Sequence, residues 1–186
     1  MLSEKSKTLA SILDANEKYR EYLYAKGYLI TTAEIIDTDS FPFYGNWVQK
    51  KIQNYKFYLH PRQCLYSLSK RGKSYFVIGH CYNPISMKEK EETILEELVE
   101  CQTDKEYFEK VSELTGIFVT GYIEENNIYM LGDATCMQTM FYGNIEGDFY
   151  ATSHSQLLGD ICGLEFDEYI ERLTHYQFYH LFLHNN

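Results

Sequence analysis

The chain has 186 residues and a formal net charge of −10, with 17 basic and 27 acidic side chains. This length suits one domain with a sizeable core. A general binder of nucleic acid or of an anionic membrane surface needs a basic face, so the charge argues against both kinds of partner. Hydrophobic residues make up 45% of the chain, which excludes wholesale disorder.

No apolar run is long enough to cross a bilayer, and residues 1–10 lack the apolar stretch of a signal peptide. The five cysteines form no CxxC pair, so their spacing indicates neither a zinc site nor a thioredoxin motif. An odd number of cysteines in an unexported chain indicates reduced thiols, which we expect to be small, buried apolar residues. The sequence therefore predicts a cytoplasmic protein with no cofactor and no metal.

The first half of the chain is predicted to begin with a helix and to continue as strands. Apolar residues at helical spacing predict an amphipathic helix over residues 4–26, which Gly27 ends. β-branched residues then predict a strand over residues 28–38, followed by a loop over residues 39–47. Further strands are expected at residues 57–59, 64–69 and 74–79.

The second half is predicted to hold two helices followed by hairpins. The charged run Lys88 to Glu100 is typical of a helix with a solvated face. Thr103 and Glu106 match a capping box that opens a second helix. Strands are then expected at 117–123, 128–131, 139–142 and 148–152, and helices at 155–161 and 166–182. Strand runs interrupted by a helix pair favour an α+β layered sandwich over a doubly wound α/β fold.

Four segments follow one another in an order that is typical of one family. They are IGHCYN at 78–83, LTGIFV at 114–119, GDATCMQTMFYG at 132–143 and YATSHSQLL at 150–158. Asparagine synthetases and related class II amidotransferases carry, in the same order, an Asn-Gly-Glu-x-Tyr-Asn strand end, a Leu-[Ser/Thr]-Gly-x-Phe-Ala strand, an Arg-Asp segment and a strand closing with Ala-Ser-Glu. Over about residues 57–163 the chain resembles the N-terminal glutamine-amidotransferase-type domain of asparagine-synthetase-like proteins.

The resemblance implies an Ntn-hydrolase-like fold, which is a four-layer α-β-β-α sandwich of two antiparallel sheets. Residues 1–163 would form the glutamine-amidotransferase-like domain. Residues 164–186 would form a C-terminal helix or a linker toward a synthetase domain with an ATP-pyrophosphatase fold, whose Ser-Gly-Gly-x-Asp loop does not occur in this sequence. The final helix is strongly apolar, and we expect it to pack on its own sheet or to dock such a domain or a second copy. Its apolar residues are Phe166, Tyr169, Ile170, Leu173, Tyr176, Phe178, Tyr179, Leu181 and Phe182.

Active members of the family use a cysteine at the mature N-terminus. Its thiol attacks the glutamine amide while its own α-amino group serves as the base. This chain begins with Met1, Leu2 and Ser3, and removal of Met1 would expose Leu2. The first cysteine, Cys64, lies in strand-like sequence deep in the domain. We therefore expect no catalytic residue.

The resemblance also points to a vestigial substrate pocket at Arg62, Gly79 and His80. In the family, the Asn and the Gly of the Asn-Gly-Glu motif donate to the oxyanion, and its Glu pairs with the substrate ammonium. Here Ile78 and His80 stand at the Asn and Glu positions, so only the Gly79 N–H remains as a donor. Arg62 is the candidate for the arginine that holds the substrate carboxylate. This pocket binds a small anion, or Arg62 and His80 are ordinary surface residues.

Two further patterns favour structural roles. Asp133 matches the aspartate of the family's Arg-Asp pair, with Gly132 in place of the arginine, and we expect it to stabilise a turn. His154 lies between Ser153 and Ser155, which suggests a Ser/His pair. However, adjacent residues at a strand end point apart, and no acid is placed to orient the histidine.

The favoured hypothesis is a degenerate, non-catalytic amidotransferase-like domain of an asparagine-synthetase-like protein. It would act as a structural or docking module, and the family name implies asparagine biosynthesis. Its partner would be an ATP-pyrophosphatase-type synthetase domain or a second copy, with a small anion or amino acid as the pocket ligand. Two alternatives stay open: an active amidotransferase or hydrolase after processing, and a regulatory domain that binds a small anion.

Overall fold

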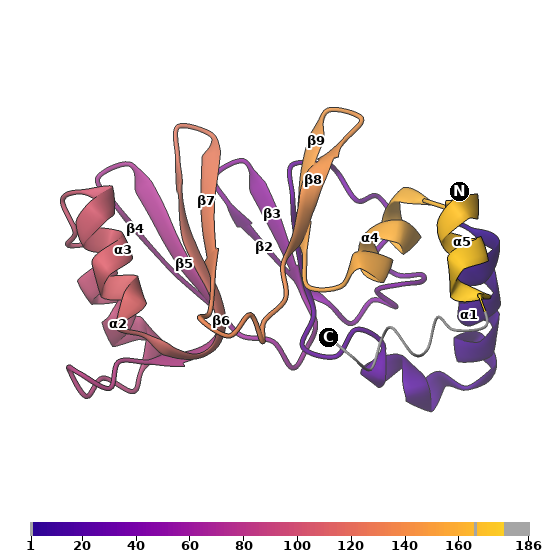
Figure 1. Ribbon diagram of the computed structural model, residues 1–186, viewed down its shortest axis with the longest axis horizontal. Coiled ribbons are helices and arrows are strands. Elements are labelled where there is room, and N and C mark those ends of the chain that lie inside the picture. The colour runs from indigo at the N-terminus through magenta and orange to yellow at the C-terminus, as the bar shows by residue number, and fades with distance from the viewer. Residues whose placement is uncertain (1, 166, 177–186) are drawn as a thin grey trace.

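The structure is a computed structural model that describes residues 2–165 and 167–176. Two antiparallel sheets face each other, with strand orders β2-β3-β1-β9-β8 and β4-β5-β6-β7 (Figure 1). The first sheet contains β1 (Tyr28–Thr31), β2 (Val48–Ile52), β3 (Tyr55–Leu59), β8 (Phe141–Ile145) and β9 (Asp148–Thr152). The second contains β4 (Leu65–Lys70), β5 (Lys73–Tyr82), β6 (Thr115–Glu124) and β7 (Asn127–Gly132). The predicted α+β class with two antiparallel sheets is confirmed.

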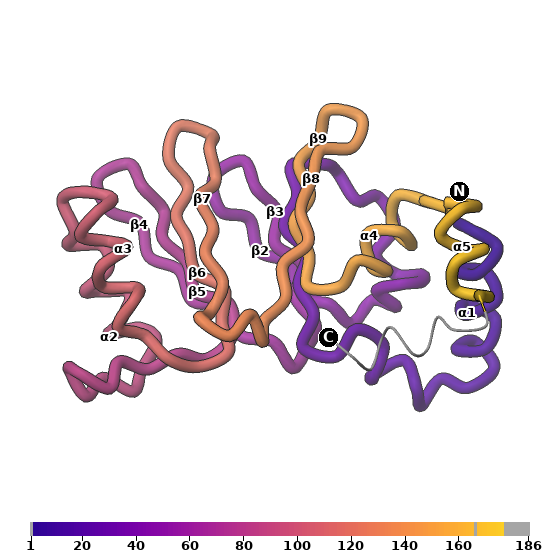
Figure 2. Tube along the Cα trace, viewed as in Figure 1, coloured from indigo at the N-terminus to yellow at the C-terminus, as the bar shows by residue number. Residues whose placement is uncertain are grey.

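Helices lie on the outer side of each sheet, as both the ribbon and the Cα trace show (Figures 1 and 2). The helices α2 and α3 flank the four-stranded sheet, and α1, α4, α5 and the 3-10 helix η1 lie on the far side of the five-stranded one. Their bounds are α1 Glu4–Ala15, η1 Glu17–Tyr22, α2 Glu91–Leu98, α3 Asp104–Ser112, α4 Ser155–Cys162 and α5 Glu168–Thr174. The order of layers is therefore helix, sheet, sheet, helix.

Three apolar layers hold this arrangement together. Between the sheets, the rings of Phe57 and Phe76 meet edge-on at 5.2 Å, with both side chains fully buried. Leu95 of α2 packs in a second layer against the four-stranded sheet, and Leu157 of α4 in a third layer against the five-stranded one. Because both faces of the central strands are covered, β5 is buried without alternation from residue 74 to residue 79.

The predicted helix over residues 4–26 is wrong beyond Ala15. The backbone of Asn16 leaves the helical region with φ −140°, and its side-chain amide donates to the carbonyl of Ile12 at 3.0 Å. A separate 3-10 helix follows. The N-terminal helix is fixed to α4 instead by the hydroxyl of Ser6, which donates to Asp160 at 2.5 Å.

Two strand predictions need correction. The strand expected over residues 28–38 stops at Thr31, whose hydroxyl accepts the N–H of Ala33 at 3.0 Å and turns the chain out of the sheet. Strand β2 was missed, because four of its five residues are exposed at the edge of the sheet and show no apolar alternation. Lysines at such an edge protect its unpaired backbone groups from another chain.

The Thr103 half of the capping box is confirmed, since its hydroxyl accepts the N–H of Glu106 at 3.2 Å, whereas the Glu106 carboxylate accepts the N–H of Gln102 at 2.7 Å. The final helix is confirmed only as α5, because residues 166 and 177–182 of the prediction lie outside the described residues. Figure 1 shows α5 beside α1 rather than on a sheet, and Lys5 pairs with Glu171 at 3.3 Å.

Within the described ranges, none of the helices combines the length and the apolar character that a membrane span requires.

Asp133 organises the connection from β7 to β8. Its carboxylate, in a residue that is 3% exposed, accepts the N–H groups of Thr135, Met137 and Gln138 at 3.0, 3.1 and 2.8 Å. Burial by itself would raise the pKa of Asp133, but these bonds and the Thr135 hydroxyl prevail and lower that pKa to about 2. The expected turn-stabilising role is confirmed.

We expect Asp133→Ala to lower the free energy of unfolding by about 2 kcal/mol, because buried N–H groups lose their acceptor. The folded pKa of about 2 lies below the ordinary value of 3.8, so the stabilisation is complete above about pH 4 and is lost as the pH falls toward 2. Urea unfolding near pH 7 and near pH 3 measures both effects. The cost of the substitution should be smaller at the lower pH. The control Glu109→Ala, at an exposed position on α3, should cost little at either pH, and equal costs of Asp133→Ala at both would contradict the assignment.

Candidate binding cavity

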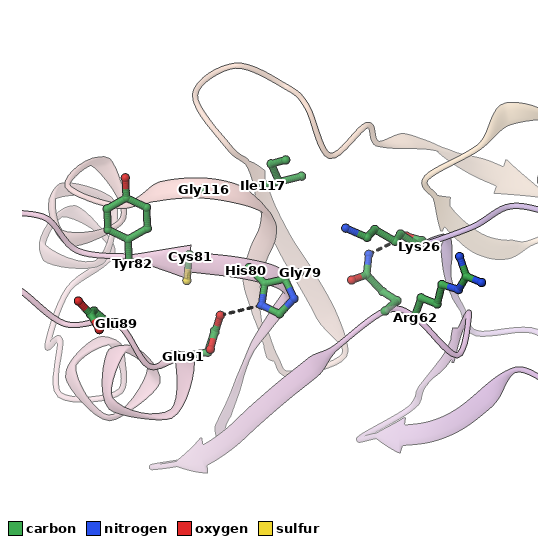
Figure 3. A pocket seen from close by; sticks show the side chains of 11 residues that line it. Lys26, Arg62, Gly79, His80, Cys81, Tyr82, Glu89, Glu91, Gly116 and Ile117 are labelled. Carbon is green, nitrogen blue, oxygen red and sulfur yellow. Dashed lines mark hydrogen bonds and ion pairs between the residues drawn. The ribbon is translucent and has the colours of Figure 1, made fainter. Parts of the chain in front are cut away.

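A cavity of about 590 Å³ opens where the two sheets meet at one end (Figure 3). One wall comes from the turn before β1 and the segment after β3, and the other from β5, β6 and the start of α2. Its lining residues are Lys26, Arg62, Gln63, Gly79, His80, Cys81, Tyr82, Glu89, Glu91, Gly116 and Ile117. The three residues predicted for the vestigial pocket, Arg62, Gly79 and His80, all line this one cavity.

Two glycines form the part of the cavity where β5 and β6 approach most closely. Gly79 and Gly116 have φ values of +98° and +136°, which side chains rarely allow. A Cβ atom on Gly79 would lie 2.3 Å from the carbonyl oxygen of Ile117, and one on Gly116 would lie 2.2 Å from that of His80. The backbone here admits no side chain at either position.

The N–H group of Gly79 donates to the carbonyl of Cys64 at 3.0 Å. This bond belongs to the pairing of β4 with β5, so the group is already committed to the sheet. The expectation that it remains a donor for an oxyanion is therefore wrong.

The arginine predicted to hold a carboxylate is engaged elsewhere. The guanidinium of Arg62 pairs with Glu21 at 3.0 Å and lies over the ring of Tyr22 at 5.2 Å. In Figure 3 it points away from His80 and Gly79, whereas the amine of Lys26 points toward them. Lys26 is the cation that the sequence analysis missed, and nothing in its local sequence marks it.

The backbone of Lys26 is held in place by Gln63. The side-chain amide of Gln63 donates to its carbonyl at 2.6 Å, and Lys26 itself has φ +58°. Its amine makes no ion pair with any residue in the described part of the chain, which leaves it available to a ligand.

The far wall of the cavity is acidic. The ring nitrogen Nδ1 of His80 lies 3.1 Å from the carboxylate of Glu91, whose side chain is only 12% exposed. Glu89 also lines this wall and is exposed. The charged run Lys88 to Glu100 was expected to be a solvated helix face. This is wrong for Glu91, the first residue of α2, which lines the cavity.

Cys81 is the only cysteine among the residues that line the cavity. Burial, reinforced by the charge of Glu91, raises the pKa of its thiol to about 12, so the thiol stays protonated at neutral pH. The expectation that all five cysteines are buried is wrong for the other four. Cys136 is exposed, and the remaining three are half-buried.

The chain is tightly packed at Gly27, just before β1. A Cβ atom on Gly27 would lie 2.6 Å from the carbonyl oxygen of Tyr24 and 3.2 Å from the hydroxyl of Ser153.

The hydroxyl of Ser153 accepts the N–H of Tyr28 at 2.9 Å and lies 2.8 Å from Nδ1 of His154. The two side chains therefore meet, and the expectation that they point apart is wrong. Ser153 is 2% exposed, which keeps a substrate from its hydroxyl.

No family model, no curated protein and no solved structure matches this chain. Among residues 2–165 and 167–176, no three or more His, Cys, Asp or Glu side chains are grouped so that they could hold a metal ion. The chemistry of the cavity rests on its own side chains. These are a free amine on one wall, carboxylates on the other and a protonated thiol, an arrangement suited to binding.

We expect Gly79→Ala and Gly116→Ala each to destabilise the fold by about 3 kcal/mol, because backbone strain and a backbone clash add. Chemical denaturation measures the loss. Gly143→Ala is the matched control on β8, since a Cβ atom there meets nothing within 4 Å. The control should stay within about 0.5 kcal/mol of the wild type. An equally small effect at Gly79 would contradict the close approach of β5 and β6.

Proposed function

We propose that this chain is a non-catalytic domain of the glutamine-amidotransferase type, with an Ntn-hydrolase-like fold. It serves as a structural or docking module for an ATP-pyrophosphatase-type synthetase domain of the asparagine-synthetase-like class. The observation that carries the proposal is the combination of the helix-sheet-sheet-helix architecture with a cavity at the expected place whose one lining cysteine, Cys81, is buried and protonated.

The positions of the four family-like segments support this proposal. The segment 78–83 ends β5, and the segment 114–119 starts β6, which pairs with it. The segment 132–143 is tied to β6 by the N–H of Asp133, which donates to the carbonyl of Phe118 at 2.9 Å. It reaches the fourth segment, 150–158, through the hydroxyl of Thr139, which donates to the carbonyl of Ser153 at 2.5 Å. All four segments therefore belong to one connected region near the cavity.

The groups at the cavity support a non-catalytic role. A nucleophile at a mature N-terminus would have to begin the chain next to this space. The segment that lies there is Lys26 followed by Gly27, and neither residue carries a hydroxyl or a thiol. The thiol of Cys81 is inside β5 and stays protonated. The alternative of an active enzyme after processing therefore finds no residue to carry it among those that line the cavity.

A docking role is favoured by the exposed apolar face of α5. Three apolar residues of this short helix, Tyr169, Ile170 and Leu173, are 63%, 47% and 39% exposed. Such a face usually marks a contact with another protein surface. Since α5 follows the sandwich in the chain and lies at its outer end, a synthetase domain reached through this segment is the occupant we favour over a second copy.

Incubation with an electrophilic glutamine analogue should leave Cys81 unmodified, because burial keeps its thiol protonated. Iodoacetamide serves as the positive control and should label the exposed Cys136 first, as peptide mass spectrometry will show. A glutamine-analogue adduct at Cys81, or on a shortened chain with a new N-terminal nucleophile, would establish the catalytic alternative.

The double variant Tyr169→Ser with Leu173→Ser should weaken binding to an ATP-pyrophosphatase-type synthetase domain from the same genome by at least about tenfold, or ~1.4 kcal/mol. Titration by light scattering measures the complex. Ile12→Ser is the matched control, because Ile12 is an exposed apolar residue of α1, at 54%. A wild-type chain that forms a dimer and ignores the synthetase domain would replace this partner with a second copy. A chain that binds neither would contradict the docking role.

A further inference from the structure

The geometry points to a ligand for the cavity: a small zwitterion whose anionic group lies at Lys26 and whose cationic group lies at Glu89 and Glu91. Its two charges are separated by a short chain, as in an ω-amino acid or a dipeptide. This assignment stands on the cavity alone and does not depend on the docking role.

The anionic end of the ligand is placed by Lys26. Its amine points into the cavity in Figure 3 and makes no ion pair with a described residue. Arg62, beside it, is paired with Glu21, which leaves Lys26 as the cation of this wall that has no ion pair with a described residue. A lysine whose backbone is fixed and whose amine is free suits a single carboxylate or similar anion.

The cationic end is placed by the two glutamates on the opposite wall. Glu91 is nearly buried, and among the described residues its side chain has one hydrogen-bonding partner, the ring nitrogen of His80 at 3.1 Å. A carboxylate accepts several hydrogen bonds, so Glu91 keeps acceptor capacity toward the cavity. Glu89 adds a second negative charge at the same end.

The space between these ends decides the shape of the ligand. Figure 3 shows Gly79 and Ile117 between the Lys26 wall and the Glu91 wall. A volume of about 590 Å³ lies within the range typical of small-molecule sites, which is roughly 300–1,000 Å³. An α-amino acid holds its two charged groups next to each other, on either side of one carbon atom. A ligand with separated charges pairs both walls at once.

Isothermal titration with glycylglycine and 5-aminopentanoate tests this assignment. We expect at least one of the two to bind at least about tenfold more tightly than pentanoate, pentylamine or glycine, a difference of ~1.4 kcal/mol. Pentanoate and pentylamine each keep one charged end, and glycine keeps both charges without the separation. Equal affinities for all five probes, or no measurable heat with any of them, would overturn the proposal.

Two charge-neutral variants test which wall holds which end. Lys26→Gln should weaken the zwitterion about tenfold and leave the affinity for pentylamine unchanged. Glu91→Gln should weaken the zwitterion and pentylamine while leaving pentanoate unchanged. Lys105→Gln and Glu109→Gln remove an exposed pair on α3, away from the cavity, and should change nothing.

Circular-dichroism melting of each variant shows whether it is folded. If Glu91→Gln does not fold, Glu89→Gln takes its place in the test. If Lys26→Gln does not fold, Lys26→Met takes its place. The opposite pattern, in which Lys26→Gln affects only the cation probe, would overturn the assigned orientation. Loss of glycylglycine binding in the α3 controls would show that the ligand lies elsewhere.

Discussion

The pairing of β5 with β6 is the constraint on which the rest of the structure depends. It is the longest ladder of the described chain, with partners from Ser74↔Ile123 to Tyr82↔Thr115. One face of this pair supplies the layer between the sheets, and the other supports α2 and α3. The same ladder ends at the cavity, where Gly79 and Gly116 let the two backbones approach. Core and cavity are therefore parts of one strand pair, and a change that separates β5 from β6 disturbs both.

The sequence predicts the fold well where burial and local chemistry agree. The two-sided burial of β5 appears as the apolar run at 75–78, and the capping box at Thr103 and Glu106 marks the start of α3 correctly. The prediction fails where tertiary contacts override local preference. Strand β2 is an exposed edge that only its pairing with β3 defines. Helix α1 stops early because Asn16 satisfies a carbonyl of the last turn with its own side chain.

The candidate site could be located from the sequence but not understood from it. The resemblance placed Arg62 with Gly79 and His80, and all three line the cavity. Their roles are set by neighbours that are distant in the sequence: Glu21 engages Arg62, and Cys64 occupies the N–H of Gly79. Lys26 lines the cavity because the turn before β1 is held by Gln63, which follows β3 in the chain. Such a position carries no local signal, since neither its spacing nor its neighbours distinguish it from any surface lysine.

Charge decides between a simple anion and a zwitterion as the ligand of this cavity. The chain carries a formal net charge of −10, so its overall field opposes the approach of a free anion. A zwitterion has no net charge and meets no such opposition, while both of its ends find a partner on the walls. The ion pair of Arg62 with Glu21 further reduces the positive charge that a lone anion would need. Glu91 is nearly buried and has one ion-pair partner among the described residues, His80, so a bound ammonium group would give its carboxylate a second.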